Sequence, residues 1–256
     1  MILVMDVGNT NIKFGVFKGD VLLESWRISA QKSQTADEIG VTIGNLLAIA
    51  NLSFKDIDGV IMASVQPALN YTVEHACRYY MDKKPFVVNA EIETGLKFLY
   101  TNSEELGADR IANAVAAFNK YGGPCVIVDC GTATTFSAVS ADAEFLGGAI
   151  APGIKASADA LTEAASKLPK IELIKPKNVI GKSTISNMQS GVINGFTGLI
   201  NHMLHSVMKE CGLKNAKVIA TGGLSELIDF DPSFHVIKDR ALALFGLKQI
   251  YDLNKK

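Results

Sequence analysis

The sequence contains no apolar run that approaches the roughly 20 residues needed for a membrane-spanning helix. It has only four cysteines, Cys77, Cys125, Cys130 and Cys211, and none stands in the Cys-x-x-Cys spacing of zinc or redox motifs. Their scatter favours free thiols in a reducing compartment. The opening run 2–5 lacks the basic and longer apolar regions of a signal peptide. We therefore expect a cytoplasmic protein that does not enter the membrane.

An excess of positive charge is also missing, because 25 Lys and Arg residues face 26 Asp and Glu residues. This balance removes the simplest electrostatic reason to bind nucleic acid or an anionic bilayer. No Gly-x-Ser-x-Gly, His-Glu-x-x-His or Gly-x-Gly-x-x-Gly motif occurs. The chain has 256 residues, which is long enough for one large domain or two of about 120 residues each. Its hydrophobic share of 48% is typical of a globular protein with a buried core.

Short apolar runs alternate with longer amphipathic segments, which is typical of an α/β protein. In the first half we predict strands at 2–7, 12–17, 21–28 and 59–64 and helices at 35–50 and 67–82. The breaker cluster 121–124 separates this half from the second. In the second half we predict strands at 125–130, 134–140, 145–150 and 217–221 and helices at 185–211 and 239–252.

The order of elements repeats between the halves. Residues 4–9 (Val-Met-Asp-Val-Gly-Asn) align with 127–132 (Ile-Val-Asp-Cys-Gly-Thr), and a second strand follows each block. Residues 60–64 align in the same way with 218–222. A period near 120 residues is too long for a solenoid repeat. The pattern predicts two similar α/β halves facing each other across a cleft, with boundaries at 1–121 and 122–256.

Each half carries a turn with the chemistry of a phosphate-binding loop. In the first turn, Asp6 ends a strand, Gly8 allows close backbone approach, and Lys13 adds a positive charge. The second turn, residues 129–135, combines an aspartate, a glycine and three threonines. We expect the two turns to hold a polyphosphate from both sides, with Asp6 suited to Mg²⁺. A third element is a strand that ends in the glycine pair of 220–223.

Two further motifs bear on chemistry. The block Gly107-Ala108-Asp109-Arg110 heads a predicted helix, where Asp109 is placed to accept a proton from a substrate hydroxyl and Arg110 to neutralise an anion. Residues 181–184 (Gly-Lys-Ser-Thr) look like the end of a P-loop. However, Pro176 stands where that motif needs its first glycine, and no strand is predicted just before it, so we exclude a P-loop.

The paired aspartate turns and the glycine pair resemble the actin-like ATPase and sugar-kinase superfamily, and this resemblance implies that the glycine pair lies near the nucleoside. At a finer level, four blocks resemble the signatures of type III pantothenate kinase, and smaller similar pieces continue to residue 223. The four blocks are 6–11, 107–114, 129–135 and 147–153. The resemblance implies duplicated actin-like, ribonuclease H-like halves, each a mixed sheet flanked by helices. It also implies ATP-dependent phosphorylation of pantothenate, the first step of coenzyme A synthesis.

The resemblance assigns roles to individual positions. It implies that Asp109 is the proton acceptor and Asp129 the ligand of a monovalent cation, K⁺ or NH₄⁺. The implied ATP contacts are Asp6, Val7, Gly8, Asn9, Thr10, Asn11, Ile12, Lys13 and Thr132, with Mg²⁺ on the phosphates. The implied pantothenate contacts are Tyr100, Gly107, Ala108, Asp109, Arg110 and Thr184. It further implies a homodimer formed through helices of the second half.

Two other functions stay open at this point. One is a sugar or acetate kinase of the same superfamily, which a panel of acceptors would distinguish. The other is a nucleotide-binding regulator or filament former, which ATP-dependent assembly without phosphoryl transfer would reveal.

Overall fold

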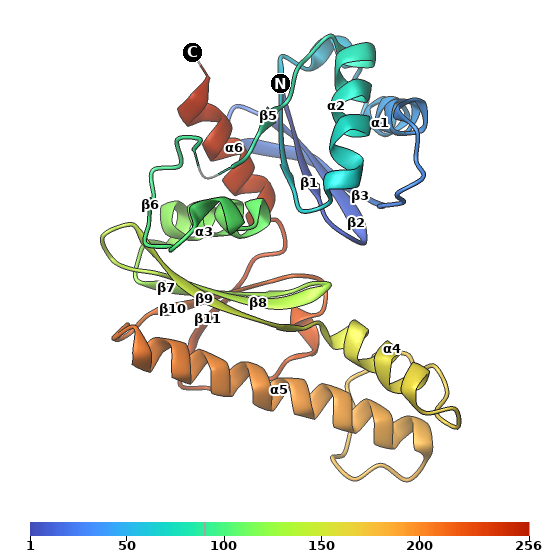
Figure 1. Ribbon diagram of the computed structural model, residues 1–256, viewed down its shortest axis with the longest axis vertical. Helices are drawn as coiled ribbons and strands as arrows, with labels where there is room; N and C mark the ends of the chain where they lie inside the picture. The colour runs from blue at the N-terminus through green and yellow to red at the C-terminus, as the bar shows by residue number, and fades with distance from the viewer. Residues whose placement is uncertain (90, 256) are drawn as a thin grey trace. The chain divides into compact units, whose positions relative to one another are not determined.

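The computed structural model describes residues 1–89 and 91–255, which divide into two compact units (Figure 1). Unit 1 comprises Met1–Leu96, Tyr100–Ala116 and Ala241–Lys256, and unit 2 comprises Lys97–Leu99 and Ala117–Arg240. The C-terminal helix, which the sequence pattern assigns to the second half, lies in unit 1. No helix in the described residues is long and apolar enough to cross a membrane.

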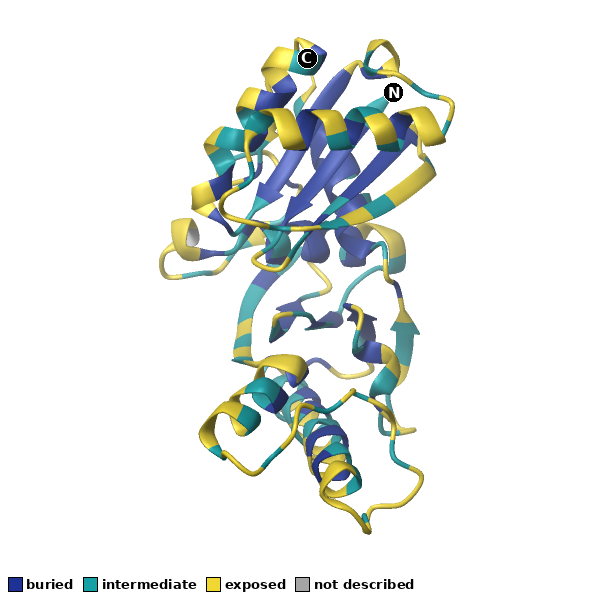
Figure 2. Cartoon of the chain, turned by 90° about the vertical axis from the view of Figure 1, so that its right-hand side faces the viewer, coloured by how far each residue is buried: buried dark blue, intermediate teal, exposed yellow. Residues whose placement is uncertain are grey.

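Unit 1 is built on a five-stranded mixed sheet of order β3-β2-β1-β4-β5. Its strands are β1 (Ile2–Val7), β2 (Asn11–Lys18), β3 (Val21–Ser29), β4 (Gly59–Ser64) and β5 (Phe86–Val87). The first three strands form an antiparallel meander, and β4 returns parallel to β1. Strands β1 and β4 are almost continuously apolar because both faces of the sheet are covered, which Figure 2 shows as a buried centre.

Helices cover both faces of this sheet. They are α1 (Ala36–Ile49), α2 (Pro67–Met81) and α6 (Leu242–Asn254), with a short 3₁₀ turn at Phe54–Asp56. Helix α1 begins at a capping box, in which Thr35 Oγ1 accepts the Glu38 N–H and Glu38 accepts the Thr35 N–H. Side chains of α1 and α2 share one apolar core with alternate residues of β1. Helix α6 packs against β1 and β4 from the other side (Figure 1).

Unit 2 is built on a six-stranded mixed sheet of order β11-β10-β7-β8-β9-β6. Its strands are β6 (Lys97–Phe98), β7 (Cys125–Cys130), β8 (Ala133–Val139), β9 (Glu144–Pro152), β10 (Lys217–Thr221) and β11 (His235–Lys238). Helices α4 (Ile154–Ala164) and α5 (Thr184–Glu210) bury their apolar faces against β7 and β8. A 3₁₀ turn, Ser225–Leu227, follows β10.

Helix α3 (Ala108–Tyr121) begins in unit 1 and ends in unit 2, and a 3₁₀ turn at Ser103–Glu105 precedes it. Most sequence-predicted elements occur within one to three residues of their expected ends. Four short or amphipathic segments were not predicted: α4, β5, β6 and β11. The last helix begins at Leu242 rather than 239, because 235–238 forms β11 and 239–241 connects it to the helix.

The predicted repetition is present in the topology. In each unit the first strand pairs antiparallel with the second and parallel with a later strand, so β7, β8 and β10 correspond to β1, β2 and β4. Asp6 lies opposite Ala63, and Asp129 lies opposite Thr221. Each aspartate is therefore the fifth residue of its strand, just before the turn.

A buried carboxylate joins the end of α3 to the end of β11 in unit 2. Asp239 Oδ2 accepts hydrogen bonds from Lys120 Nζ and the Tyr121 hydroxyl, each at 2.7 Å, while the Asp239 N–H donates to the Ala220 carbonyl. These residues stand near 116/117 and 240/241, two of the four points at which the chain passes from one unit to the other. The cluster therefore anchors these two connections within unit 2.

We expect Asp239→Asn to lower the free energy of unfolding of unit 2 by about 1–3 kcal/mol, because a buried acceptor of two hydrogen bonds loses its charge. Urea unfolding followed by far-UV circular dichroism measures the loss. The matched control is Asp159→Asn, whose exposed pair with Lys155 should contribute about 0.5 kcal/mol or less. Equal losses in the two variants would contradict a special role for Asp239.

Candidate active site

The first phosphate-type turn joins β1 to β2 in unit 1. Asp6 is buried, and its Oδ2 lies 3.2 Å from Nζ of Lys13, which is its partner in the β1–β2 register. The Gly8 N–H donates to the Asn11 carbonyl at 3.0 Å, and a Cβ at Gly8 would lie 3.0 Å from that same oxygen. The glycine therefore lets the turn close tightly.

The side chains of this turn divide by exposure. Val7 and Ile12 are buried and anchor it, whereas Asn9 and Thr10 are exposed. The turn thus presents polar groups to solvent from a rigid apolar base, which suits an anionic ligand.

The Gly-Ala-Asp-Arg block forms the N-terminal end of α3, as predicted. The Gly107 carbonyl accepts the Ile111 N–H at 3.1 Å, and Asp109 Oδ1 accepts the Arg110 N–H at 2.8 Å. A Cβ at position 107 would lie 2.6 Å from Asp109 Oδ1. Gly107 therefore leaves room for the Asp109 carboxylate in this orientation. Arg110 and Ala108 are buried beside it.

The Asp109 carboxyl group has a raised pKa and therefore binds a proton more tightly than an ordinary aspartate. Burial raises its pKa above the ordinary value of 3.8, and the negative charge of Asp6 raises it further. The Arg110 N–H and the Arg110 charge oppose this effect without cancelling it. Within unit 1, Asp6 of the first turn is thus close enough to Asp109 of α3 for its negative charge to raise the pKa of Asp109. A carboxylate with a raised pKa is a better proton acceptor than an exposed one.

We expect Asp6→Asn to lower the pKa of Asp109, because it removes the second of the two causes that raise it. Carbon-13 NMR titration of the Asp109 side-chain carboxyl measures this directly, independently of turnover. Asp20→Asn is the control, since the Asp20 side chain is fully exposed and should leave the titration unchanged. An unchanged Asp109 pKa in the Asp6 variant would show that the two carboxylates do not interact.

The second phosphate-type turn joins β7 to β8 in unit 2. Its Gly131 N–H donates to the Ala133 carbonyl at 3.0 Å, and Thr132 is exposed at its tip. The turn rests on Gly153, the residue before α4, where a Cβ would lie 2.1 Å from the Thr132 carbonyl oxygen. This close contact explains why the block 147–153 ends in a glycine. The sequence pattern did not predict the contact between Gly153 and the second turn.

The two remaining predicted contacts, Tyr100 and Thr184, belong to neither turn in the sequence. Tyr100 is half-buried in the loop after β6 and belongs to unit 1. Thr184 is the exposed first residue of α5 in unit 2, directly after Ser183, whose side chain caps the helix. No strand occurs in 165–183, all of which the structure describes, so the Gly-Lys-Ser-Thr sequence there is a helix cap and not a P-loop.

The predicted residues therefore fall into two groups. Unit 1 holds the first turn, residues 6–13, together with Tyr100 and the 107–110 block. Unit 2 holds Asp129, Thr132 and Thr184. Within unit 1 the structure brings the candidate base to the phosphate-type turn, and within unit 2 it brings Asp129 to the glycine pair after β10.

Comparison with solved structures identifies the fold. A conserved Baf family protein from Campylobacter jejuni matches with 21% identity and a TM-score of 0.60 over 98% of both chains. The activator of 2-hydroxyisocaproyl-CoA dehydratase from Clostridium difficile, solved with bound ADPNP, matches with 14% identity and a TM-score of 0.60, covering 99% of this chain and 94% of that one.

A third match is the inorganic polyphosphate/ATP-glucomannokinase from Arthrobacter, at 13% identity and a TM-score of 0.52, covering 98% of this chain and 97% of that one. At these identities the matches establish the fold alone. They confirm the predicted actin-like α/β architecture of two mixed sheets flanked by helices.

The family follows from the sequence itself. A family model described as type III pantothenate kinase matches residues 2–206, which include both turns, the Gly-Ala-Asp-Arg block and most of α5. The chain therefore belongs to the type III pantothenate kinase family, whose members use ATP to phosphorylate pantothenate in coenzyme A biosynthesis.

Proposed function

We propose that Asp109 is the proton acceptor in the transfer of the ATP γ-phosphoryl group to the primary hydroxyl of pantothenate. The observation that carries this proposal is the place of Asp109 in the first turn of α3, where burial and the nearby Asp6 raise the pKa of its carboxyl group. Hydrogen bonding from the Arg110 N–H holds one carboxylate oxygen. The other oxygen then takes the proton of the substrate hydroxyl as the bond from that hydroxyl oxygen to the γ-phosphorus forms. The bond from the γ-phosphorus to the β–γ bridging oxygen breaks in the same transfer, and ADP leaves.

Residues 6–13 and Thr132 are proposed to bind the ATP phosphates. Support comes from the tight Gly8 turn with its exposed polar side chains and from Lys13, whose ammonium group is already placed beside Asp6. Mg²⁺ commonly uses one or two protein carboxylates together with phosphate oxygens and water. Asp6 offers such an oxygen, and the ion would neutralise charge on the phosphates.

Pantothenate is an anion with a terminal carboxylate, so its site needs positive charge. We assign this role to Arg110, with Tyr100, Gly107, Ala108 and Thr184 as further contacts. Asp129 is proposed to hold a monovalent cation, K⁺ or NH₄⁺. Gly222 leaves room for this carboxylate, because a Cβ at Gly222 would stand 2.5 Å from Asp129 Oδ1. We also propose a cytoplasmic homodimer.

The test is a coupled assay of ATP consumption with pantothenate, a sugar panel and acetate as acceptors, each with KCl or with tetramethylammonium chloride. We expect turnover with pantothenate alone and stimulation by KCl. Preference for a sugar or acetate would instead support another actin-like kinase. ATP-dependent sedimentation without transfer to any acceptor would support a regulator or filament former.

A further inference from the structure

The turn after β10 in unit 2 packs directly against Asp129. Thr221 lies opposite Asp129 in the parallel β7–β10 pair, so Gly222 stands beside the end of β7. A Cβ at Gly222 would lie 2.5 Å from Asp129 Oδ1 and 2.5 Å from both the carbon and the oxygen of the Cys130 carbonyl. Any side chain here would therefore displace the Asp129 carboxylate or the backbone next to it.

The backbone of Gly222 has a φ of +84°, which side-chain-bearing residues rarely adopt. This conformation turns the chain sharply at the strand end. The buried Ser225 holds the turn, because its hydroxyl donates to the Gly222 carbonyl at 2.8 Å and its N–H donates to the same oxygen at 3.3 Å. The Leu224 N–H adds a longer contact, 3.4 Å, to the Cys130 carbonyl.

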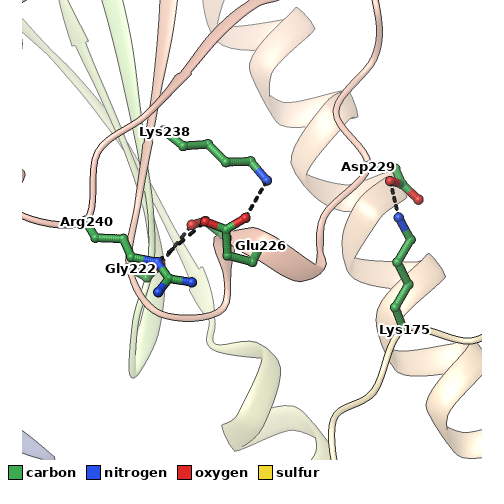
Figure 3. Close-up of polar contacts among 7 residues, drawn as sticks. Lys175, Gly222, Glu226, Asp229, Lys238 and Arg240 are labelled. Carbon is green, nitrogen blue, oxygen red and sulfur yellow. Dashed lines mark hydrogen bonds and ion pairs between the residues drawn. The ribbon is translucent and has the colours of Figure 1, made fainter.

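Glu226, at the C-terminal end of the same turn, forms two ion pairs. Glu226 lies 3.0 Å from Lys238 Nζ and 3.5 Å from Arg240 Nε, as Figure 3 shows beside Gly222. Because Lys238 ends β11, these ion pairs attach the turn to the neighbouring strand. Hydrogen bonds from Ser225 and the ion pairs of Glu226 thus hold the segment 222–226, and its first residue, Gly222, lies against Asp129.

We propose that Gly222 and Ser225 are positioning residues that set the orientation of the Asp129 carboxylate for a monovalent cation. The inference rests on the proposed function, in which Asp129 is the cation ligand. Residues that orient a ligand without touching the ion typically change metal affinity 10- to 100-fold when altered. The glycine pair then serves the cation site through Gly222, in addition to any contact with the nucleoside.

The test compares Gly222→Ala with Gly212→Ala in the full-length protein. Gly212 also has a positive φ, +63°, but a Cβ there would meet nothing within 4 Å, so this control carries the backbone strain without the contact. Two readouts are used: the KCl concentration at the midpoint of the K⁺-dependent rise in Tm, and the KCl concentration for half-maximal activation. Tetramethylammonium chloride keeps the ionic strength constant.

We expect Gly222→Ala to raise both KCl midpoints by about 10-fold or more, Ser225→Ala to raise them less, and Gly212→Ala to leave them at the wild-type values. A folded Gly222→Ala protein with wild-type midpoints would overturn the inference. If Gly222→Ala fails to fold, Ser225→Ala decides: a raised midpoint supports the inference, and a wild-type midpoint overturns it.

Asp129→Asn separates this inference from the function on which it rests. If Asp129→Asn abolishes the K⁺ response while both turn variants keep it, the positioning role alone is wrong. If wild type and Asp129→Asn respond to KCl alike, Asp129 is not the cation ligand, and the proposed cation site and the positioning role fail together.

Discussion

Asp109→Asn should lower kcat for pantothenate phosphorylation by about 10² or more, the usual cost of losing a general base. The amide keeps the size of the side chain and an oxygen that accepts the Arg110 N–H, so the N-terminal end of α3 should retain its geometry. It cannot accept the hydroxyl proton. The coupled assay at saturating ATP and pantothenate measures kcat.

The same substitution should leave stability at neutral pH unchanged or increase it. The pKa of Asp109 is raised in the folded protein, so its favourable contribution is complete below the unfolded-state pKa and is lost as pH rises through the folded-state pKa. Above that pH the buried charge is a cost, which asparagine removes. A kcat loss together with a lowered Tm would indicate structural damage rather than loss of a base.

Glu104→Gln is the matched control for this prediction. Glu104 is an exposed carboxylate in the turn just before α3, and its neutralisation should change kcat little. If Asp109→Asn retains near-normal turnover, or if both variants lose activity equally, Asp109 does not act as the proton acceptor.

Gly246→Ala should destabilise unit 1 by about 1–3 kcal/mol, the usual cost of overpacking a tight contact. Gly246 lies in α6 where this helix crosses α3, and a Cβ there would stand 1.9 Å from the Ala112 carbonyl oxygen. Because the obstacle is backbone and not a flexible side chain, the helices must separate. Helix α3 carries Asp109, so kcat should fall as well.

The single tryptophan, Trp26, packs against the core of unit 1, so its fluorescence during urea unfolding reports on this unit. The control is Gly198→Ala in α5 of unit 2, where a Cβ would meet nothing within 4 Å; its unfolding is followed by far-UV circular dichroism, because Trp26 reports on unit 1. Alanine is the better helix former by about 1 kcal/mol, so this variant should be neutral or stabilising. If Gly246→Ala is as stable as the wild type, α3 and α6 are not held in close contact at this point.

The sequence by itself determined the local chemistry and the repeated order of elements. Buried strands must be apolar and tight turns need glycine, so β1 and β7 with their following turns could be found from residue types alone. The equivalence of Asp6 and Asp129 followed from the same pattern, and the Gly-Ala-Asp-Arg block followed from its place at a helix start.

Only the tertiary structure decided which of these segments meet. The pattern of α6 shows an apolar helix, but nothing in it says that the helix returns to the first sheet, because apolar contacts have no direction and many faces compete for them. The raised pKa of Asp109 depends on burial and on Asp6, about a hundred positions earlier in the chain. The contact of Gly222 with Asp129 likewise arises from the parallel pairing of β7 with β10, which no local sequence preference can specify.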